Sequence, residues 1–577
     1  MRLRATRLTA IANAVRKLFS PTSLFTAGEQ GWVYDPSNLS FLFQDSAGTT
    51  PVTAMEQPVG LQLDTRLGAP TTLGAELVTN GDFSNGSTGW AYDAGWSFSG
   101  GSAVGNIVTG NGYLYQPGKL TVGKFYSFTF TVVSITSGSI RPIANSTIGT
   151  NVTSAGTYTQ ILLCSGGTSI TLQGVGGFSG TIDNISVREL PGNHRYQTTS
   201  ANRPVVSARV NLLTKTERFD DAVWTKSNAT IASGFADING QLLAQKLVAT
   251  TTNAAHSAAQ DFSALNGVKY TSLFRVKAAE YSYCRIAGQG LAFAGVPAVY
   301  FNLANGTVGA VSGPVDSYAV TSAGDGWYLV SLTTTAVASS TAGFRISAVS
   351  TANTEIFAGD GTSGIYTFGA DLRPTNQGVN LPPYQRVNTS TDYDTAGFPI
   401  YIKANGSNQF MVSNAIDFTA TDKMTVWAGL RKLSDVNTQM FVESSSAAEA
   451  NNGAFNLITN NVSSGYKYQS VSRGSLSTWA SSTDSAFSAP LTNVIAISND
   501  ISGDSIVLRV NKTQVATSSA DQGTGNYGNY VSYHYARAGT SLFFNGHDYG
   551  SICRGAASSA AQITAAEGWI NQRTKAY

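Results

Sequence analysis

Aromatic side chains that gather in glycine- and asparagine-rich runs have the clearest chemical use in this sequence. Sugar rings are held by aromatic faces, with amides and carboxylates bonding to the hydroxyls. The candidate glycan contacts are Trp96, Tyr113 and Tyr115 in one group, and Tyr527, Tyr530, Tyr533 and Tyr535 in another. The alternatives are a place in the core for the tryptophan, packing on strand faces for the tyrosines and, for the second group, an interface between subunits.

Residues that could carry out catalysis are weaker candidates. Glycoside hydrolysis needs two carboxylates on either side of the scissile bond, and Asp392 with Asp394, or Asp548, lie in no recognisable motif. No GxSxG turn precedes an expected helix, and the sequence lacks the short regular repeat of a parallel β-helix. We therefore expect no enzyme and assign no catalytic residue, with a polysaccharide depolymerase as the rival interpretation.

Composition predicts an all-β protein. Of the 577 residues only 12% are charged, while aromatics make up 10% and glycine contributes 59 residues; typical domains have about 25% charged residues. Such glycine-, aromatic- and β-branched-rich chains form strands. The net charge of +2 gives no reason to expect nucleic acid as a partner. The three cysteines are far apart, so free buried thiols are expected.

The first 23 residues predict a short basic amphipathic helix that Pro21 ends. Leu8, Ile11, Val15 and Leu18 fall at helical spacing, and the surrounding basic residues are Arg2, Arg4, Arg7, Arg16 and Lys17. We expect the helix to dock on an acidic protein surface or to bundle with copies of itself. Binding to a membrane surface is the less favoured alternative.

Residues 24–74 carry apolar clusters separated by turn signals, with little core of their own. The clusters include Phe25, Trp32, Tyr34, Leu39, Phe41 and Phe43. We expect this arm to be extended and to bury them against another surface. The stretch resembles the N-terminal segment of virion-attached proteins of tailed bacteriophages and prophages. That resemblance implies attachment to a portal, tail or capsid protein, or to sister chains; the alternative is an arm packed on its own first domain.

In residues 75–190, apolar and polar residues alternate as they do in short strands. This pattern predicts a β-sandwich. The opening NGDFSNGSTGW and closing TIDNISV resemble carbohydrate-binding jelly-roll modules. The resemblance implies a structural Ca²⁺ on Asp82 and Asp183; alternatively, Asp82 caps a turn and Asp183 ends a strand. The sequence of residues 191–211 is similar in character to that of the arm. We therefore expect the sandwich to be inserted between two parts of one segment, which brings Asp64 close to Pro191.

Two further β-sandwiches are expected. Residues 212–373 repeat the opening and closing of the first sandwich in divergent form, and 374–392 form a linker. Residues 393–577 contain FMVSNAIDFTATDKMTVWAGLRKL and TSLFFNGHDYGSICRG, a pair that resembles the concanavalin A-like, laminin-G-like sandwich of phage proteins. A C-terminal helix should start after Ser558 or Ser559.

The combined interpretation is a phage tail or head fibre. The protein would be made in the bacterial cytoplasm and located in the virion. It would be anchored through its N-terminal arm, would assemble with itself as a homotrimer and would display lectin-like domains to host-surface glycans. Several weak sites in one trimer would gain affinity through multivalency. The other alternative is an architectural decoration protein of the capsid or tail without any ligand.

Overall fold

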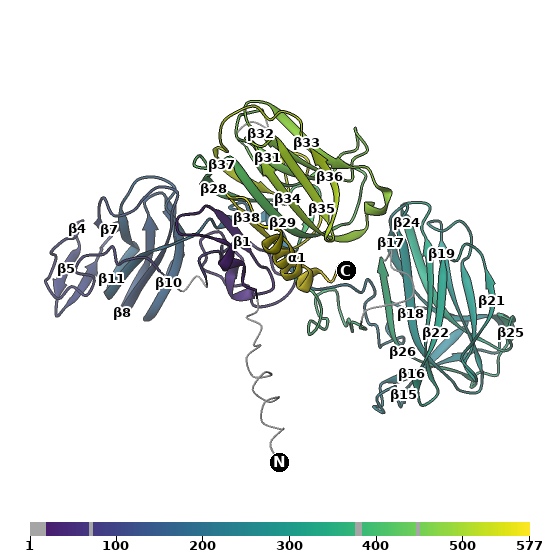
Figure 1. Ribbon diagram of the computed structural model, residues 1–577. Helices are drawn as coiled ribbons and strands as arrows, with labels where there is room; N and C mark the ends of the chain where they lie inside the picture. The colour runs from purple at the N-terminus through teal and green to yellow at the C-terminus, as the bar shows by residue number, and fades with distance from the viewer. Residues whose placement is uncertain (1–18, 69–72, 375–382, 446–449) are drawn as a thin grey trace, which may run out of the picture. The chain divides into compact units, whose positions relative to one another are not determined.

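The computed structural model describes residues 19–68, 73–374, 383–445 and 450–577. It confirms a mostly β fold with sandwich-like domains and one short C-terminal helix (Figure 1). The chain forms two compact units, of which the second is residues 208–399 with the short segment 489–491. The expected helix over residues 1–23 lies mostly outside the described residues, which begin just before the 3-10 turn η1, Pro21–Leu24.

The C-terminal part of the first unit is a two-sheet sandwich. One sheet has the order β13-β27-β38-β29-β34-β35-β36, with β1 also paired to β38. Its strands are β1 Gly31–Tyr34, β13 Val205–Ser207, β27 Tyr401–Asn405, β29 Lys423–Lys432, β34 Leu491–Asp500, β35 Ser505–Val510, β36 Thr513–Ser518 and β38 Asn545–Arg554.

The facing sheet has the order β2-β3-β12-β28-β37-β30-β31-β32-β33. Its strands are β2 Leu42–Phe43, β3 Leu61–Gln62, β12 Arg195–Tyr196, β28 Met411–Asp417, β30 Gln439–Ser444, β31 Phe455–Asn460, β32 Tyr468–Arg473, β33 Ser477–Ser482 and β37 Asn529–His534. Strands from three separate stretches of the chain therefore build one domain, which we call the host sandwich: residues 24–64, 193–207 and 400–577.

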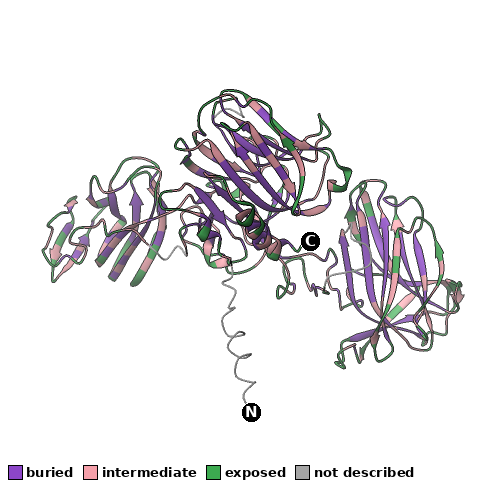
Figure 2. Ribbon diagram, viewed as in Figure 1, coloured by how far each residue is buried: buried purple, intermediate pink, exposed green. Residues whose placement is uncertain are grey.

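Alternation of apolar and polar residues explains why these strands form and which face they bury. In β35, Ile506, Leu508 and Val510 are buried while the residues between them are partly exposed. The inward side chains of both sheets form one continuous core. Figure 2 shows the strands of this body as mostly buried.

The N-terminal arm is part of this core. Strand β1 pairs antiparallel with β38, from Gly31 opposite Arg554 to Tyr34 opposite Ser551. Trp32 and Tyr34 are completely buried, and so is Leu42. In Figure 1 this early segment lies within the body built by the last strands of the chain.

The other predicted anchor residues also contact their own chain. Phe25 packs beside the C-terminal helix cluster, and Leu39 packs on the host core. Phe41 and Phe43 pack on a cluster that contains Phe125 of the first inserted sandwich. The prediction of burial on another protein is therefore wrong for Trp32 and Tyr34, and the alternative of an arm packed on its own chain describes them. Phe25, Leu39, Phe41 and Phe43 are only partly buried, and their contact with another protein stays a prediction. The apolar clusters of the arm are short strands whose partners lie hundreds of residues away, and no local pattern reveals such partners.

A buried arginine links the three stretches of the host sandwich. Arg195 on β12 is fully buried, and its Nη2 lies 2.8 Å from Asp548 Oδ2 on β38 of the facing sheet. Its Nε donates to Gln62 Oε1 at 2.9 Å. The guanidinium also lies over the rings of Tyr34 and Tyr535, at 4.5 and 5.1 Å. Each stretch therefore contributes a group that the buried cation needs.

The first inserted sandwich, residues 75–190, leaves and rejoins the host at neighbouring strands. Gln62 of β3 pairs with Arg195 of β12. Asp64 Oδ2 accepts a hydrogen bond from the Asn193 backbone at 2.8 Å, and the Asp64 backbone donates to His194 Nδ1 at 2.9 Å. These bonds confirm the predicted approach of Asp64 to the residues that follow Pro191.

The second unit is inserted in the same way, which the sequence did not indicate. Strand β13, directly before residue 208, pairs with β27, directly after residue 399, with Ser207 opposite Tyr401. Both inserted modules therefore start and end at adjacent, hydrogen-bonded host strands. After the linker expected at 374–392, the chain does not form a separate third domain. It continues into β27 of the host sandwich.

The first inserted sandwich is built around two long strands, β8 and β11, that pair along most of their length with several register shifts. Its core contains Phe83 and Trp90, which pack on each other. The strands are β4 Ala91–Tyr92, β5 Trp96–Ser99, β6 Ser102–Asn106, β7 Asn111–Gln116, β8 Phe125–Ala144, β9 Thr147–Ile148, β10 Gly156–Leu163 and β11 Ile170–Leu190.

The second unit has a seven-stranded and a six-stranded sheet around a core with Phe219 and Trp224. Its strands are β14 Thr225–Ser227, β15 Ala229–Phe235, β16 Ala244–Ala249, β17 Asn253–Ala264, β18 Lys269–Ala278, β19 Tyr283–Gly290, β20 Ala298–Asn302, β21 Thr307–Ser312, β22 Ser317–Gly324, β23 Trp327–Thr335, β24 Ser340–Val349, β25 Ile356–Ala358 and β26 Gly364–Pro374.

The helix α1, Ala560–Thr574, starts at the predicted place. Ser559 is its N-cap, and Gln562 completes a capping box. Ala566 and Ile570 are buried against the host sandwich. The remaining short elements are the 3-10 turns η2 Leu39–Phe41, η3 Ser200–Asn202 and η4 Ser485–Phe487.

All three cysteines are free and buried, as predicted. None of the helices within the described ranges is long and apolar enough to cross a bilayer.

We predict that Arg195→Ala destabilises the host sandwich by about 3–5 kcal/mol, because the change leaves the Asp548 charge buried without its partner. Arg188→Ala is the matched control. It removes a partly exposed pair with Glu76, which should cost about 0–1 kcal/mol. Calorimetric unfolding of the full chain would measure both. Equal losses in the two variants would contradict the central role of Arg195.

We also predict that His194 makes the host sandwich sensitive to acid. Burial lowers the pKa of His194 to about 4, whereas an unfolded histidine titrates near 6.5. The unfolded chain therefore binds the proton first, and stability falls as the pH drops below about 6.5, by about 2 kcal/mol between pH 7 and pH 5. In His194→Gln the loss over this range should be smaller by that amount. Identical pH profiles would contradict the prediction.

Candidate functional site

A groove with a volume of about 450 Å³ opens on the outer face of the host sheet that contains β31, β32 and β33. Its floor consists of Ile458, Gln469, Val471 and Trp479. Their sequence neighbours point the other way, into the core, because side chains alternate along a strand. Trp479 is 49% exposed, although Thr478 and Ala480 beside it are buried. A large aromatic face is thus presented to solvent from a rigid strand.

Loops from three places form the walls of the groove. The β31–β32 hairpin, the loop between β37 and β38, and the residue just before β30 contribute most of the side chains, and the first residue of β33 adds one more. The wall residues are Thr438, Asn461, Ser463, Ser464, Tyr466, Ser477, Arg537 and Leu542. Asn461 Nδ2 donates to Gln469 Oε1 at 3.2 Å, which fixes two amides at the floor of the groove.

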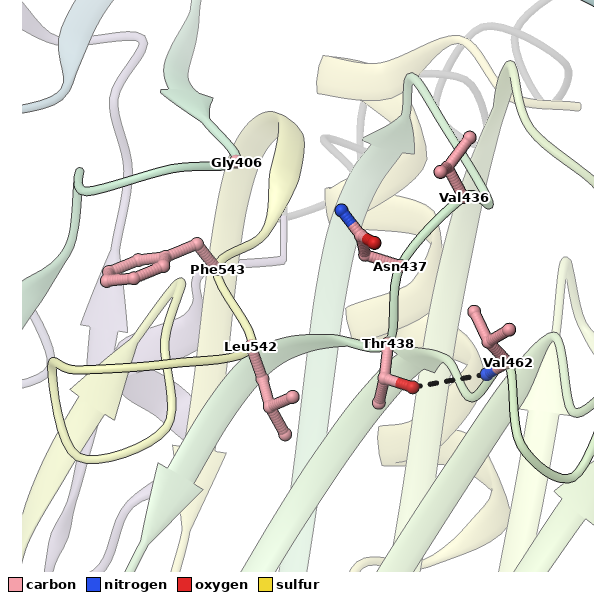
Figure 3. A pocket seen from close by; sticks show the side chains of 7 residues that line it. All are labelled: Gly406, Val436, Asn437, Thr438, Val462, Leu542 and Phe543. Atoms are coloured by element: carbon pink, nitrogen blue, oxygen red, sulfur yellow. Dashed lines mark hydrogen bonds between the residues drawn. The ribbon is translucent and has the colours of Figure 1, made fainter.

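A second hollow, of about 440 Å³, shares Thr438 and Leu542 with the groove. Figure 3 shows its lining coming from separate loops, with Val436, Asn437 and Thr438 on one, Val462 on another and Leu542 with Phe543 on a third. The Thr438 hydroxyl oxygen accepts a hydrogen bond from the Val462 backbone at 3.2 Å, so two of the loops are joined. The two hollows together extend the site along the loops.

The loop between β37 and β38 holds an unusual backbone conformation. Tyr535, Ala538 and Leu542 have φ values of 70°, 49° and 50°, in the left-handed region that residues other than glycine rarely adopt. Such conformations cost of order 1 kcal/mol each and persist where surrounding contacts enforce them. Strain of this kind concentrates at functional sites, and here it shapes the wall that carries Arg537.

A buried glutamate supplies contacts that enforce this loop. Glu443 on β30 is 1% exposed. Its Oε2 accepts a hydrogen bond from the Ala538 backbone at 3.1 Å, and its Oε1 lies 3.7 Å from Arg537 Nε. The loop also closes on itself, because the Arg537 backbone donates to Ser541 O at 2.8 Å. Glu443 therefore positions the wall and does not itself line the groove.

Two lysines on one carboxylate hold the neighbouring loop. Lys432 Nζ and Lys467 Nζ each lie 3.0 Å from an Asp435 oxygen. Burial lowers the pKa of Lys432 to about 8, and its ammonium lies 4.7 Å from the centre of the Tyr468 ring. At neutral pH the pair remains charged, and it fixes the loop that leads to Thr438.

The tyrosines predicted near the C-terminus do not form one exposed patch. Tyr527 and Tyr535 are buried in the host core. Tyr530 is half-buried and donates from its hydroxyl to Asn452 O at 2.7 Å, and Tyr533 is half-buried as well. The prediction is wrong for Tyr527 and Tyr535, which flank β37 and whose rings pack in the host core against Phe455, Phe441 and Phe544.

The aromatic residues predicted as glycan contacts in the first inserted sandwich do not all lie on the surface. Trp96 is buried in the core on Phe178, so it is not a surface contact. Tyr113 and Tyr115 lie on one face of β7, where Tyr113 is 38% exposed and Tyr115 is half-buried. Only these two keep the exposure that a glycan contact needs, and their role stays a prediction.

The predicted calcium ligands lie on neighbouring segments but make separate contacts. The Ile185 backbone donates to Gly81 O at 2.9 Å, so the first and last parts of this sandwich meet there. Asp82 accepts hydrogen bonds from the Ser84 backbone and hydroxyl, and Asp183 from the Asn184 backbone. No group of three or more His, Cys, Asp or Glu side chains suited to a metal occurs among the described residues.

Sequence reasoning did not single out the groove residues. Trp479 lies in the run STWASS, where small polar residues surround a single tryptophan. Alternation gave no usable signal, because it would place the large apolar Trp479 inward and the small residues beside it outward, the reverse of what the structure shows. Arg537 and Glu443 gave no signal either, since their contact joins residues far apart in the chain.

The comparisons with known proteins do not assign the chain to a family. The sequence matches no protein-family model and no curated protein. A solved tandem of two CBM22 domains from Paenibacillus barcinonensis Xyn10C is similar at 10% identity and a TM-score of 0.23, covering 52% of this chain and 98% of that one. A triple jelly roll fold from an archaeal virus turret covers 81% and 89%, at 10% identity and a TM-score of 0.12. Likenesses this low carry no functional argument.

We predict that Glu443→Ala loosens the wall of the groove without unfolding the host sandwich. The Ala538 amide would lose its buried acceptor and the Arg537 guanidinium an ion-pair partner, so trypsin should cleave after Arg537 much faster than in the wild type. Glu443→Gln is the matched variant, since it retains an acceptor without the charge and should fall between the two. Unchanged cleavage in Glu443→Ala would show that the loop is held by other contacts.

Proposed function

We propose that the groove binds carbohydrate, and that the protein works as a glycan-binding protein. The observation that carries the proposal is Trp479, a half-exposed indole at the floor of a hollow with amide and hydroxyl groups around it. Sugars bind in this way, with their apolar C–H face on an aromatic ring and their hydroxyls on fixed polar groups. A purely architectural protein has no need for such a groove.

Binding without cleavage is the favoured activity. Glycosidases use two carboxyl groups about 5–10 Å apart. Arg537 is the one charged residue among the residues that line the two described hollows, and no Asp or Glu lines either of them. The depolymerase alternative would need a pair of carboxylates elsewhere in the chain, and we propose it only as the rival.

We further propose that the protein is a bacteriophage virion protein, a fibre or spike that presents the groove to host-surface glycans. This part rests on the sequence resemblance of residues 24–64. Because those residues belong to the host sandwich, attachment to a portal, tail or capsid protein would use the basic residues before Pro21. Assembly as a homotrimer would place several grooves side by side and raise the affinity through multivalency.

We predict that Trp479→Ala abolishes or strongly weakens binding to host-surface polysaccharide, by at least tenfold, because stacking on the ring is lost. Binding of the purified chain to immobilised polysaccharides extracted from a panel of bacterial surfaces would measure the loss.

The control is Tyr318→Ala, which removes an aromatic residue of similar exposure, 43%, from the second unit. It should leave binding unchanged. If Trp479→Ala binds like the wild type, or if the wild type binds none of the polysaccharides, the proposed function is wrong.

A further inference from the structure

We propose that the second hollow is a subsite for an acetylated sugar of the bound glycan; this inference rests on the proposed function. In this subsite the aliphatic side chains of Val436, Val462 and Leu542 contact the acetyl methyl group, and the amide of Asn437 donates to the acetyl oxygen. The volume of about 440 Å³ lies in the range of sites that hold a small molecule, so the sugar that carries the acetyl group also has room.

The apolar lining of the hollow is open to water. Val436 is 77% exposed and Val462 is 51% exposed, and both line the hollow together with Leu542. Single exposed aliphatic side chains are ordinary on protein surfaces, whereas three around one hollow form a contact surface. They offer no hydrogen bond to a sugar hydroxyl and gain most from contact with another aliphatic group. Since none of the seven lining residues is charged, the hollow fits an uncharged substituent that ends in a methyl group.

The polar side of the hollow favours an acetyl group over a methyl group alone. Asn437 is exposed, and Figure 3 shows its amide projecting from the loop that also carries Val436 and Thr438. Its side chain forms no hydrogen bond with any other residue that the structure describes, so its N–H groups are available to a ligand. An acetyl group carries a carbonyl oxygen next to its methyl group, so a donor beside an apolar surface matches both of its parts.

The loop that carries Val436 is fixed before a ligand arrives. Asn460 is buried, and its Nδ2 donates to Asp435 O at 3.0 Å and to Asn437 O at 2.8 Å. One buried amide therefore holds the backbone carbonyls on both sides of Val436. A surface that is already positioned loses less conformational freedom on binding than a mobile one, so more of the interaction appears as affinity.

The hollow is continuous with the groove that contains Trp479. Thr438 and Leu542 line both of them, so a glycan that stacks one sugar on Trp479 extends into the hollow with a neighbouring sugar. The occupant of the hollow is therefore part of the same glycan, and its acetyl group determines which glycans bind well.

The test uses the full chain and the surface polysaccharides of the panel, each in its native form, after mild alkali and after a further N-deacetylation. Mild alkali removes O-acetyl esters and leaves N-acetyl amides, so the two treatments separate the two sources of the acetyl group. We expect one of these treatments to weaken binding about tenfold, because the methyl contact and the hydrogen bond are both lost.

Re-acylation of the N-deacetylated samples separates the acetyl group from the charge of the free amine. An N-formyl group removes that charge and restores the carbonyl without the methyl group, whereas an N-acetyl group restores both. If the bound group is an amide, we expect acetylation to recover the full affinity and formylation to recover only part of it.

Variants assign the effect to the hollow. Val436→Thr with Val462→Thr replaces a methyl group of each valine by a hydroxyl group at nearly unchanged volume. This double variant should lose the preference for the acetylated form and bind the deacetylated form like the wild type. Asn437→Ala should reduce the preference. Val337→Thr makes the same exchange at a valine of the second unit that is 52% exposed, and this matched control should keep the preference.

The outcomes separate the two proposals. Binding that depends on Trp479 but is equal for native and deacetylated polysaccharides, or that is confined to glycans without acetyl groups, overturns the acetyl subsite and leaves the glycan-binding function standing. A preference for the acetylated form that survives in the double valine variant overturns the assignment to this hollow. Binding to no member of the panel overturns both proposals.

Discussion

The buried charge of Arg195 is the constraint on which the rest of the structure depends. Burying a guanidinium completely destabilises the fold unless an opposite charge and hydrogen-bond acceptors surround it. Asp548 supplies the charge, Gln62 an acceptor, and Tyr34 and Tyr535 their ring faces. The arginine comes from the segment after the first insertion, and its partners come from the N-terminal arm and the end of the chain. The host sandwich is therefore complete only when all three stretches have met.

This arrangement explains how the chain carries two large insertions. Each inserted module begins and ends at host strands that are already hydrogen-bonded to one another, so the insertion need not separate them. The same sheet that receives β3 and β12 at one end carries the groove at the other, on β31, β32 and β33. Strands form the fixed floor of the groove, and loops supply most of the polar side chains of its walls. Many binding sites are built in this way, on loops that a rigid scaffold positions.

Composition and alternation were sufficient to predict the all-β fold and the capped C-terminal helix, because these follow from local patterns. The place of Trp32 in the host core was not predictable, since its partner strand lies about five hundred residues away. The tyrosine run misled for a related reason: Tyr535 has the right type for a sugar contact, but it lies directly after β37 and its ring packs in the host core. The outward position of Trp479 was not predictable either, because the large apolar residue of an alternating strand is expected on the buried face.

The most direct test of the discontinuous host sandwich is amide hydrogen exchange on the isolated full chain. The peptides to follow are 31–43 and 193–207, with 546–554 as the reference. The structure predicts that all three are protected and that they lose protection together as denaturant is added, because they belong to one cooperative domain. Fast exchange in residues 31–43 while residues 546–554 stay protected would contradict this account. It would show that the N-terminal segment is an arm that does not belong to the host sandwich.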